Sequence, residues 1–477
     1  MALQVTEALL LGLAKAKTLA DARALVQEGV FVSLGRSPEG VLLWGTCEAS
    51  APHSPSVDLA GATPMPGCTC RAKQPCKHAV GLLVSFLEKP DAFVSSEPPA
   101  IREAKSRGRS PANKEAAAVR KTGIQRAALD LLERLLIDVT AAGLGTFREE
   151  AATRLAKQAR QMTDAYLSGA AHALKRLAAL APIERSKDRE DPEPGAALAD
   201  DDRHRLMARH LVRLWTMVKK GKQLLDEKLD EGATASDSDV VLEELLGRVW
   251  LLTELRERCY TRKDLSLMEL AFERYDDRAR EERIEQSYLV DLADGAVLLD
   301  RWHRPFVSLA HTPQKDGFEA LLEIADAAVY PGFLNRRVRW ESGTLKLRDV
   351  APSDWKRLHA TASPLEKAFA SFKEQIKNPL APDEAVAFVA VSELGLSAGR
   401  PVLVDPNGTR LALVDSPVAR FRSAANVAPA VGALLQNGRL ERPAALLVRL
   451  WRGFDDNAVR GQPLTLVVGE RRIRLGL

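Results

Sequence analysis

The chain has 477 residues, of which 46% are hydrophobic, and its 68 basic and 64 acidic side chains give a formal net charge of +4. This length exceeds what one hydrophobic core usually organises, so about two to four domains are expected. The near-balance of charge and the 5% aromatic content are not typical of a chain that binds nucleic acid over its whole surface. No segment approaches the ~18 consecutive apolar residues of a membrane span, and the N-terminus lacks a basic signal-peptide region, which favours the cytoplasm.

The N-terminal part of the chain predicts a small sheet between helices. Apolar positions at helical spacing indicate one or two short helices in residues 1–29. Residues 30–47 hold two β-rich runs joined by a loop that contains glycine and proline, and residues 57–59 are a candidate third strand. From His78 onward, apolar residues at i, i+3, i+4 and i+7 predict an amphipathic helix that ends before Pro90.

Three of the five cysteines and one histidine lie within eleven residues between that sheet and that helix, as Cys68, Cys70, Cys76 and His78. Structural zinc sites take four tetrahedral Cys or His ligands. In extended chain, residues i and i+2 point the same way, whereas on a helix they lie ~200° apart. Cys76 is therefore expected just before the helix, with His78 in its first turn. The four residues predict one closed, structural Zn²⁺; unrelated cysteines and a redox pair are the alternatives.

Basic residues accompany this cluster and the segment that follows it. Three thiolates on Zn²⁺ leave a net charge of −1, which neighbouring basic side chains offset in part. Residues 91–121 predict a disordered linker, because they hold few large apolar side chains. Within it, residues 102–121 carry seven basic and two acidic side chains, either as a solubilising tether or as an arm that contacts phosphate or an acidic partner. The candidate contact residues are Arg71, Lys73, Lys77, Arg107 and Arg109.

The remaining chain predicts a helical region and then a mixed region. Apolar periodicity indicates an all-helical domain over residues 122–284, with its last helix over residues 263–282. Residues 285–477 mix strands and helices, and Asp294-Gly295 predicts a two-residue hairpin turn. The apolar run from Pro443 to Trp451 predicts a short helix.

The cysteine motif resembles the SWIM zinc finger, which is marked by Cys-x-Cys and then Cys-x-His. Cys68-Thr-Cys70 and Pro75-Cys76-Lys-His78-Ala-Val-Gly-Leu-Leu carry this resemblance, with a short gap of five residues between the pairs. Residues 126–180 and the hairpin over residues 401–413 are similar to the long bacterial SWIM proteins. The resemblance implies a ββα finger with zinc on the four ligands that binds DNA or protein. It also implies association with MoxR-type AAA ATPases and von Willebrand A proteins.

The predicted architecture is a multidomain α+β chain. Its expected parts are N-terminal helices (1–29), a SWIM finger (30–90), the linker (91–121), an α-helical domain (122–284) and a mixed α+β domain (285–477). The first functional hypothesis is a non-enzymatic adaptor whose finger recognises a protein or nucleic acid. One alternative is a DNA-binding protein that uses the finger and the 102–121 arm. The other is an enzyme with an unidentified site in 285–477, although no phosphate-loop, zinc-protease or esterase motif occurs.

Overall fold

A computed structural model describes residues 5–37, 41–48, 52–59, 64–70, 72, 75–95, 111–146, 149–181, 200–231, 237–309, 314–416, 431, 442–453 and 456–475. The chain divides into two compact units, Met1–Ala117 and Ala118–Leu477. Both units contain helices and antiparallel sheets, so the predicted multidomain α+β class is confirmed. None of the helices within the described ranges has the length and apolar character that a bilayer crossing requires.

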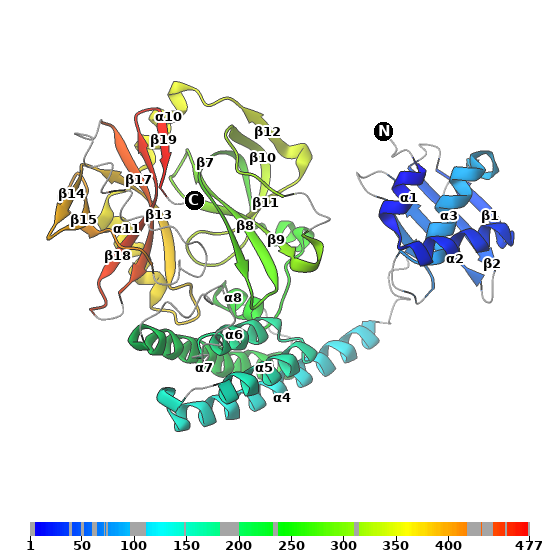
Figure 1. Ribbon diagram of the computed structural model, residues 1–477, viewed down its shortest axis with the longest axis horizontal. Helices are drawn as coiled ribbons and strands as arrows, with labels where there is room; N and C mark the ends of the chain where they lie inside the picture. Colours follow the sequence, from blue (N-terminus) through cyan, green and yellow to red (C-terminus); the bar gives the residue numbers. More distant parts are fainter. Residues whose placement is uncertain are drawn as a thin grey trace, which may run out of the picture. The chain divides into compact units, whose positions relative to one another are not determined.

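The first unit is one sheet with helices α1, α2 and α3 on one of its faces (Figure 1). The strand order is β5-β4-β2-β1-β6, with β3 paired to β2, and among these described strands β1 and β6 are the parallel pair. The elements are α1 Glu7–Leu13, α2 Ala16–Gln27, β1 Phe31–Arg36, β2 Leu42–Glu48, β3 Pro52–His53, β4 Pro55–Asp58, β5 Met65–Cys68, α3 Lys77–Glu88, η1 Pro90–Ala92 and β6 Val94–Ser95.

The N-terminal helices share one hydrophobic core with the rest of this unit. Leu10 of α1 and Leu19 of α2 are buried in the same cluster as Leu82 of α3. A Cβ atom on Gly45 would lie 2.8 Å from the backbone oxygen of Ser33 and 2.9 Å from Cδ1 of Leu82, so glycine here lets β2 pass close to β1 and α3. The boundary predicted at residue 29 therefore falls inside one core rather than between two folded parts.

The predicted linker is partly structured. Strand β6 and the start of helix α4 (Pro111–Ala142) both lie within residues 91–121, and residues 96–110 lie outside the described part of the chain. Residues 91–121 are charged and hold few large apolar side chains, which is typical of a linker. Ala116, Ala117 and Ala118 nevertheless favour a helix here, because alanine is the strongest helix former.

Helices α4–α8 of the second unit lie together and bury one apolar core (Figure 1). Leu132 of α4, Met162 of α5, Leu174 of α6 and Val218 of α7 are each fully buried in that core. The elements are α4, η2 Leu144–Thr146, α5 Glu149–Asp164, α6 Ser168–Ala178, α7 Asp200–Glu231, α8 Asp237–Leu245 and α9 Leu252–Glu257.

Two bundle histidines make the stability of the second unit sensitive to acid. Burial lowers the pKa of His172 and of His210 to about 4, and the positive charges of Arg280 and Arg176 add to the effect. Because an unfolded histidine titrates near 6.5, folding favours the neutral imidazoles, and this contribution is complete above that pH. We expect stability in urea to fall as the pH drops from about 6.5 to about 4. A His172→Gln/His210→Gln variant should lose less stability over this window, and an identical pH profile for both proteins would contradict the assignment.

In the rest of the second unit, the described residues form three sheets, with helices α10 and α11 beside them. Their strand orders are β11-β10-β7-β8-β9 with β12 beside β10, then β13-β17-β18-β19, then β14-β15-β16. Met268 and Tyr288 of the first sheet share a buried cluster with Leu447 and Val467 of the second. The elements are β7 Thr261–Asp277, β8 Glu282–Asp291, β9 Val297–Pro305, η3 Phe306–Ser308, β10 Leu321–Val329, β11 Val338–Trp340, η4 Ser342–Thr344, β12 Leu345–Arg348, α10 Pro352–Thr361, α11 Leu365–Ile376, β13 Glu384–Val391, β14 Glu393–Ser397, β15 Arg400–Val404, β16 Arg410–Ala412, β17 Ala444–Arg452, β18 Val459–Val468 and β19 Arg471–Arg474.

Two predicted helices in this region are strands, whereas the hairpin predicted over residues 401–413 is confirmed by the pairing of β15 with β16. The helix expected over residues 263–282 is β7, and the one expected over residues 443–451 is β17. Both strands are buried on both faces, so their apolar residues run on without the alternation that marks a half-exposed strand. The predicted boundary at residues 284/285 consequently cuts through β8. Strands β8 and β9 form a hairpin that contains Asp294-Gly295, but its loop is longer than the two residues predicted, because β8 ends at Asp291 and β9 begins at Val297. Gly295 has φ +74°, whereas Asp294 lacks the positive φ that a two-residue type I′ turn needs at both positions.

Candidate metal centre

The four predicted ligands come from the end of a strand and the start of a helix. Cys68 is the last residue of β5, and Cys70 follows it by two positions. Cys76 is the N-cap of α3 with extended backbone (φ −85°, ψ 163°), and His78 lies in the first turn. The ligand atoms of all four residues lie within 4.8 Å of one another. The chain therefore brings the two halves of the motif together at a strand-to-helix junction.

The spacing of these atoms fits a tetrahedral metal ion. Nδ1 of His78 lies 3.9 Å from Sγ of Cys68 and 4.0 Å from Sγ of Cys76. Zinc–sulfur bonds of ~2.3 Å and a zinc–nitrogen bond of ~2.05 Å place S and N about 3.6 Å apart in a tetrahedron. A shift of a few tenths of an ångström would thus close the site around an ion. Three sulfurs and one imidazole are a donor set that suits zinc.

The site is continuous with the core of the first unit. Cys76 and His78 are 3% and 6% exposed, whereas Cys68 and Cys70 are half-buried and pack against the same apolar cluster as α3. A metal ion here would link β5 to the first turn of α3 beneath a partial apolar cover. Loss of the ion would therefore affect the packing of the whole unit.

The surroundings of Cys76 and His78 favour the deprotonated side chains that bind a metal ion. The pKa of Cys76 is lowered to about 4, first by its hydrogen bond with the Cys68 thiol and also by the backbone N–H groups of Ala79 and His78. That same hydrogen bond, together with burial, raises the pKa of Cys68. The hydrogen bond between the two thiols therefore favours a pair with one thiolate and one proton. Burial lowers the pKa of His78, so its imidazole is neutral and available as a ligand at neutral pH.

Of the basic residues predicted to contact a partner, the structure describes one. Lys77 is exposed in the first turn of α3. The other four, Arg71, Lys73, Arg107 and Arg109, lie outside the described residues.

Sequence reasoning missed one residue beside the site. The ring of His53 in β3 packs against the ring of His78, with 4.5 Å between their centroids. No spacing rule links a histidine in a strand to a ligand 25 positions later, since only the pairing of β2 with β3 brings it there. Cys47, which we expected in the core, is indeed fully buried in β2.

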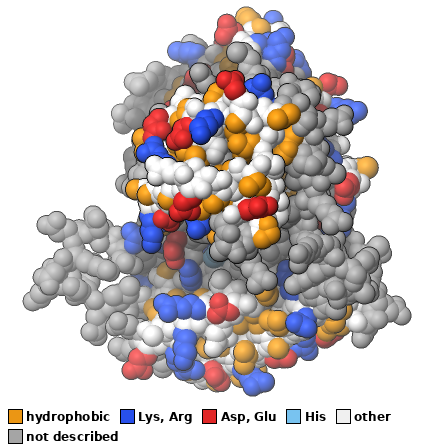
Figure 2. Space-filling view, turned by 90° about the vertical axis from the view of Figure 1, so that its right-hand side faces the viewer, with side chains coloured by type: hydrophobic (Ala, Val, Ile, Leu, Met, Phe, Trp, Pro, Cys, Tyr) orange, Lys and Arg blue, Asp and Glu red, His pale blue; other side chains and the backbone are white. Residues whose placement is uncertain are grey.

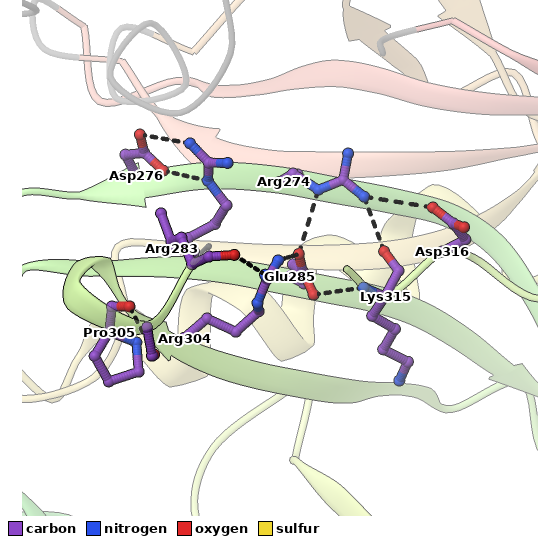
Figure 3. Close-up of polar contacts among 10 residues, drawn as sticks. Arg274, Asp276, Arg283, Glu285, Arg304, Pro305, Lys315 and Asp316 are labelled. Carbon is purple, nitrogen blue, oxygen red and sulfur yellow. Dashed lines mark hydrogen bonds and ion pairs between the residues drawn. The ribbon is translucent and has the colours of Figure 1, made fainter. Parts of the chain in front are cut away.

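A buried charged cluster in the C-terminal region is centred on Glu285 (Figure 3). Glu285 of β8 is fully buried, and its carboxylate accepts hydrogen bonds from Arg304 (2.7 Å) and from the backbone N–H of Lys315 (3.0 Å). Arg274 lies 3.4 Å from the same carboxylate and donates to the Lys315 carbonyl at 2.8 Å. The cluster therefore anchors the chain around Lys315 to the sheet.

Comparison with known families bears on the helical bundle. Residues 120–236 match the SWIM-associated four-helix bundle domain. This SWIM-associated bundle corresponds to most of α4 and to α5, α6 and α7, and the match supports a SWIM-type family for the chain. No curated protein and no solved structure matches the chain. A SWIM-associated bundle thus follows, in the same chain, a unit that holds a Cys/His cluster with metal-binding geometry.

Proposed function

We propose that this chain is an adaptor whose first unit is a SWIM zinc finger that binds a protein partner, and whose second unit is a scaffold. The observation that carries the proposal is the convergence of Cys68, Cys70, Cys76 and His78 in a chain that also contains a SWIM-associated bundle. The cluster would hold the first unit in its folded, partner-binding form. The bundle would join that unit to the rest of the chain.

The ligand set argues for a structural ion rather than a catalytic one. Four protein ligands fill the tetrahedral coordination of zinc, so no position is left for water or substrate. The ion would contribute by holding β5 against the start of α3. We therefore place the activity of the first unit in recognition, and we propose that the chain is not an enzyme.

The open face of the first unit's sheet, opposite α3, favours a protein partner over nucleic acid. Cross-strand partners share a face, and the register puts twelve of the described strand residues on this one. They are Ser33, Gly35, Leu42, Trp44, Thr46, Glu48, Pro52, Ser56, Asp58, Met65, Gly67 and Val94. None is basic, whereas phosphate binding needs Lys or Arg. On the side shown in Figure 2, acidic, basic and hydrophobic side chains are interspersed among the described residues, without a continuous basic surface.

Affinity capture from the cytoplasmic fraction of the native host tests this proposal. The full chain should retain a protein partner after nuclease treatment and in moderate salt. The resemblance to long bacterial SWIM proteins makes a MoxR-type AAA ATPase or a von Willebrand A protein the first candidate for a purified binding assay. A Met65→Asp variant, which alters a side chain that is 71% exposed on the open face, should weaken capture without loss of zinc. Capture that disappears with nuclease, or that falls steeply with salt, would favour the DNA-binding alternative instead.

A further inference from the structure

His53 contacts the metal-binding motif from outside the four ligands. Its ring is tilted by 39° against the ring of His78 at a centroid distance of 4.5 Å. It is held there by strand pairing, because His53 in β3 lies opposite the buried Cys47 in β2. His53 is not itself a member of the described group whose ligand atoms lie within 4.8 Å of one another.

The residues after His53 contact the other half of the motif. The backbone N–H of Ser54 donates to Oγ1 of Thr69, between the first two cysteines, at 2.9 Å. Pro55 in β4 is paired with Cys68 in β5. The segment of residues 53–55 therefore reaches both the Cys-x-Cys half and the Cys-x-His half of the motif, although it supplies no ligand.

Contact with His53 would control the orientation of the His78 ring. Nδ1, rather than Nε2, is the ring nitrogen that lies near the sulfurs of Cys68 and Cys76. A ligand that binds through Nδ1 must keep its ring at one particular rotation about the Cβ–Cγ bond, because the bound atom is close to the backbone. The χ2 torsion of histidine is broad, so the side chain does not fix this rotation by itself.

We propose that His53 is a positioning residue that packs against His78 and holds its Nδ1 toward the three sulfurs. This inference rests on the proposed function, since it assumes that the four ligands bind a metal. Groups next to the ligands of a metal site orient those ligands, and replacing one typically weakens metal affinity about 10–100-fold. The contact between the two rings, rather than a charge on His53, carries the effect.

Replacement of His53 in the full chain tests its positioning role separately from the metal site itself. We expect His53→Ala to weaken zinc binding about 10-fold, measured by competition with a chromophoric chelator. His53→Phe keeps an aromatic ring against His78 and should restore most of that affinity. Cobalt absorption in the visible range provides a second readout, because His53→Ala should alter the tetrahedral spectrum while His53→Phe should preserve it. His204→Ala, which removes a histidine of α7, is the matched control for nonspecific binding.

The outcomes distinguish a failure of the positioning role of His53 from a failure of the metal site. A wild-type chain that binds neither zinc nor cobalt would refute the metal site itself. If the wild type binds zinc and His53→Ala binds it equally tightly with the same cobalt spectrum, the positioning role of His53 is wrong. A His53→Phe variant as weak as His53→Ala would refute the packing of the two rings as the cause.

Discussion

Replacing Cys76 with serine is expected to release the metal and to unfold the first unit while the second stays folded. Structural zinc in small fingers contributes about 10–16 kcal/mol of apparent binding free energy, which matches or exceeds the ~5–15 kcal/mol net stability of a domain. Cys76 is both a ligand and a member of the apolar core that contains Leu10 of α1 and Leu19 of α2. The loss of folded structure should therefore include the N-terminal helices as well as the finger.

Hydrogen exchange read by mass spectrometry measures this result unit by unit. In the Cys76→Ser variant, peptides from residues 5–95 should lose protection and those from residues 118–477 should keep it. The matched control is Cys259→Ser, which removes an exposed thiol from the second unit and should leave both patterns unchanged. Full protection of residues 5–95 in a zinc-free Cys76→Ser variant would show that the metal does not hold this unit together.

Replacing Arg449 is expected to cause the largest loss of stability in the second unit. This arginine is 1% exposed in β17 and forms an ion pair with Glu273 of β7 in the neighbouring sheet. It also donates to Tyr288 and to Gln462, at 2.9 Å each. Removal of one partner from a buried ion pair costs about 3–5 kcal/mol, because the other charge stays buried without its compensation. We expect Arg449→Ala to destabilise the second unit by about this amount.

A double variant tests whether the buried charge is the cause. Arg449→Met keeps most of the side-chain volume but removes the cation, so it should still destabilise the unit through the carboxylate of Glu273. Arg449→Met combined with Glu273→Gln should recover part of that loss in urea unfolding, because the uncompensated negative charge is then absent. If Arg449→Ala changes the unfolding free energy by less than ~1 kcal/mol, the ion pair does not support the two-sheet packing in the way proposed.

The sequence predicted the candidate site better than the large domain. The spacing of Cys68, Cys70, Cys76 and His78 carried local geometric information, since residues two apart share a side only where the chain is extended. In contrast, β7 and β17 are covered on both faces, and a continuous apolar run does not distinguish a buried strand from a buried helix.

Contacts made in three dimensions were beyond prediction from one sequence. His53 reaches His78 only through the pairing of β2 with β3. Arg449 looked like an ordinary charged residue in an apolar run, and the partner that allows its burial lies in a different sheet. Helix α4 begins in a stretch whose charge is typical of a linker, because helix propensity and apolar burial are separate properties.

The metal content of the purified full chain tests the central claim most directly. Elemental analysis after expression in zinc-replete medium and removal of loosely bound metal should find one zinc ion per chain. The content should drop to near zero in Cys76→Ser, which lacks one of the four ligands, and stay at one in Cys259→Ser. A wild-type chain without stoichiometric zinc, or a Cys76→Ser variant that retains it fully, would contradict the assignment of Cys68, Cys70, Cys76 and His78 as a structural zinc site.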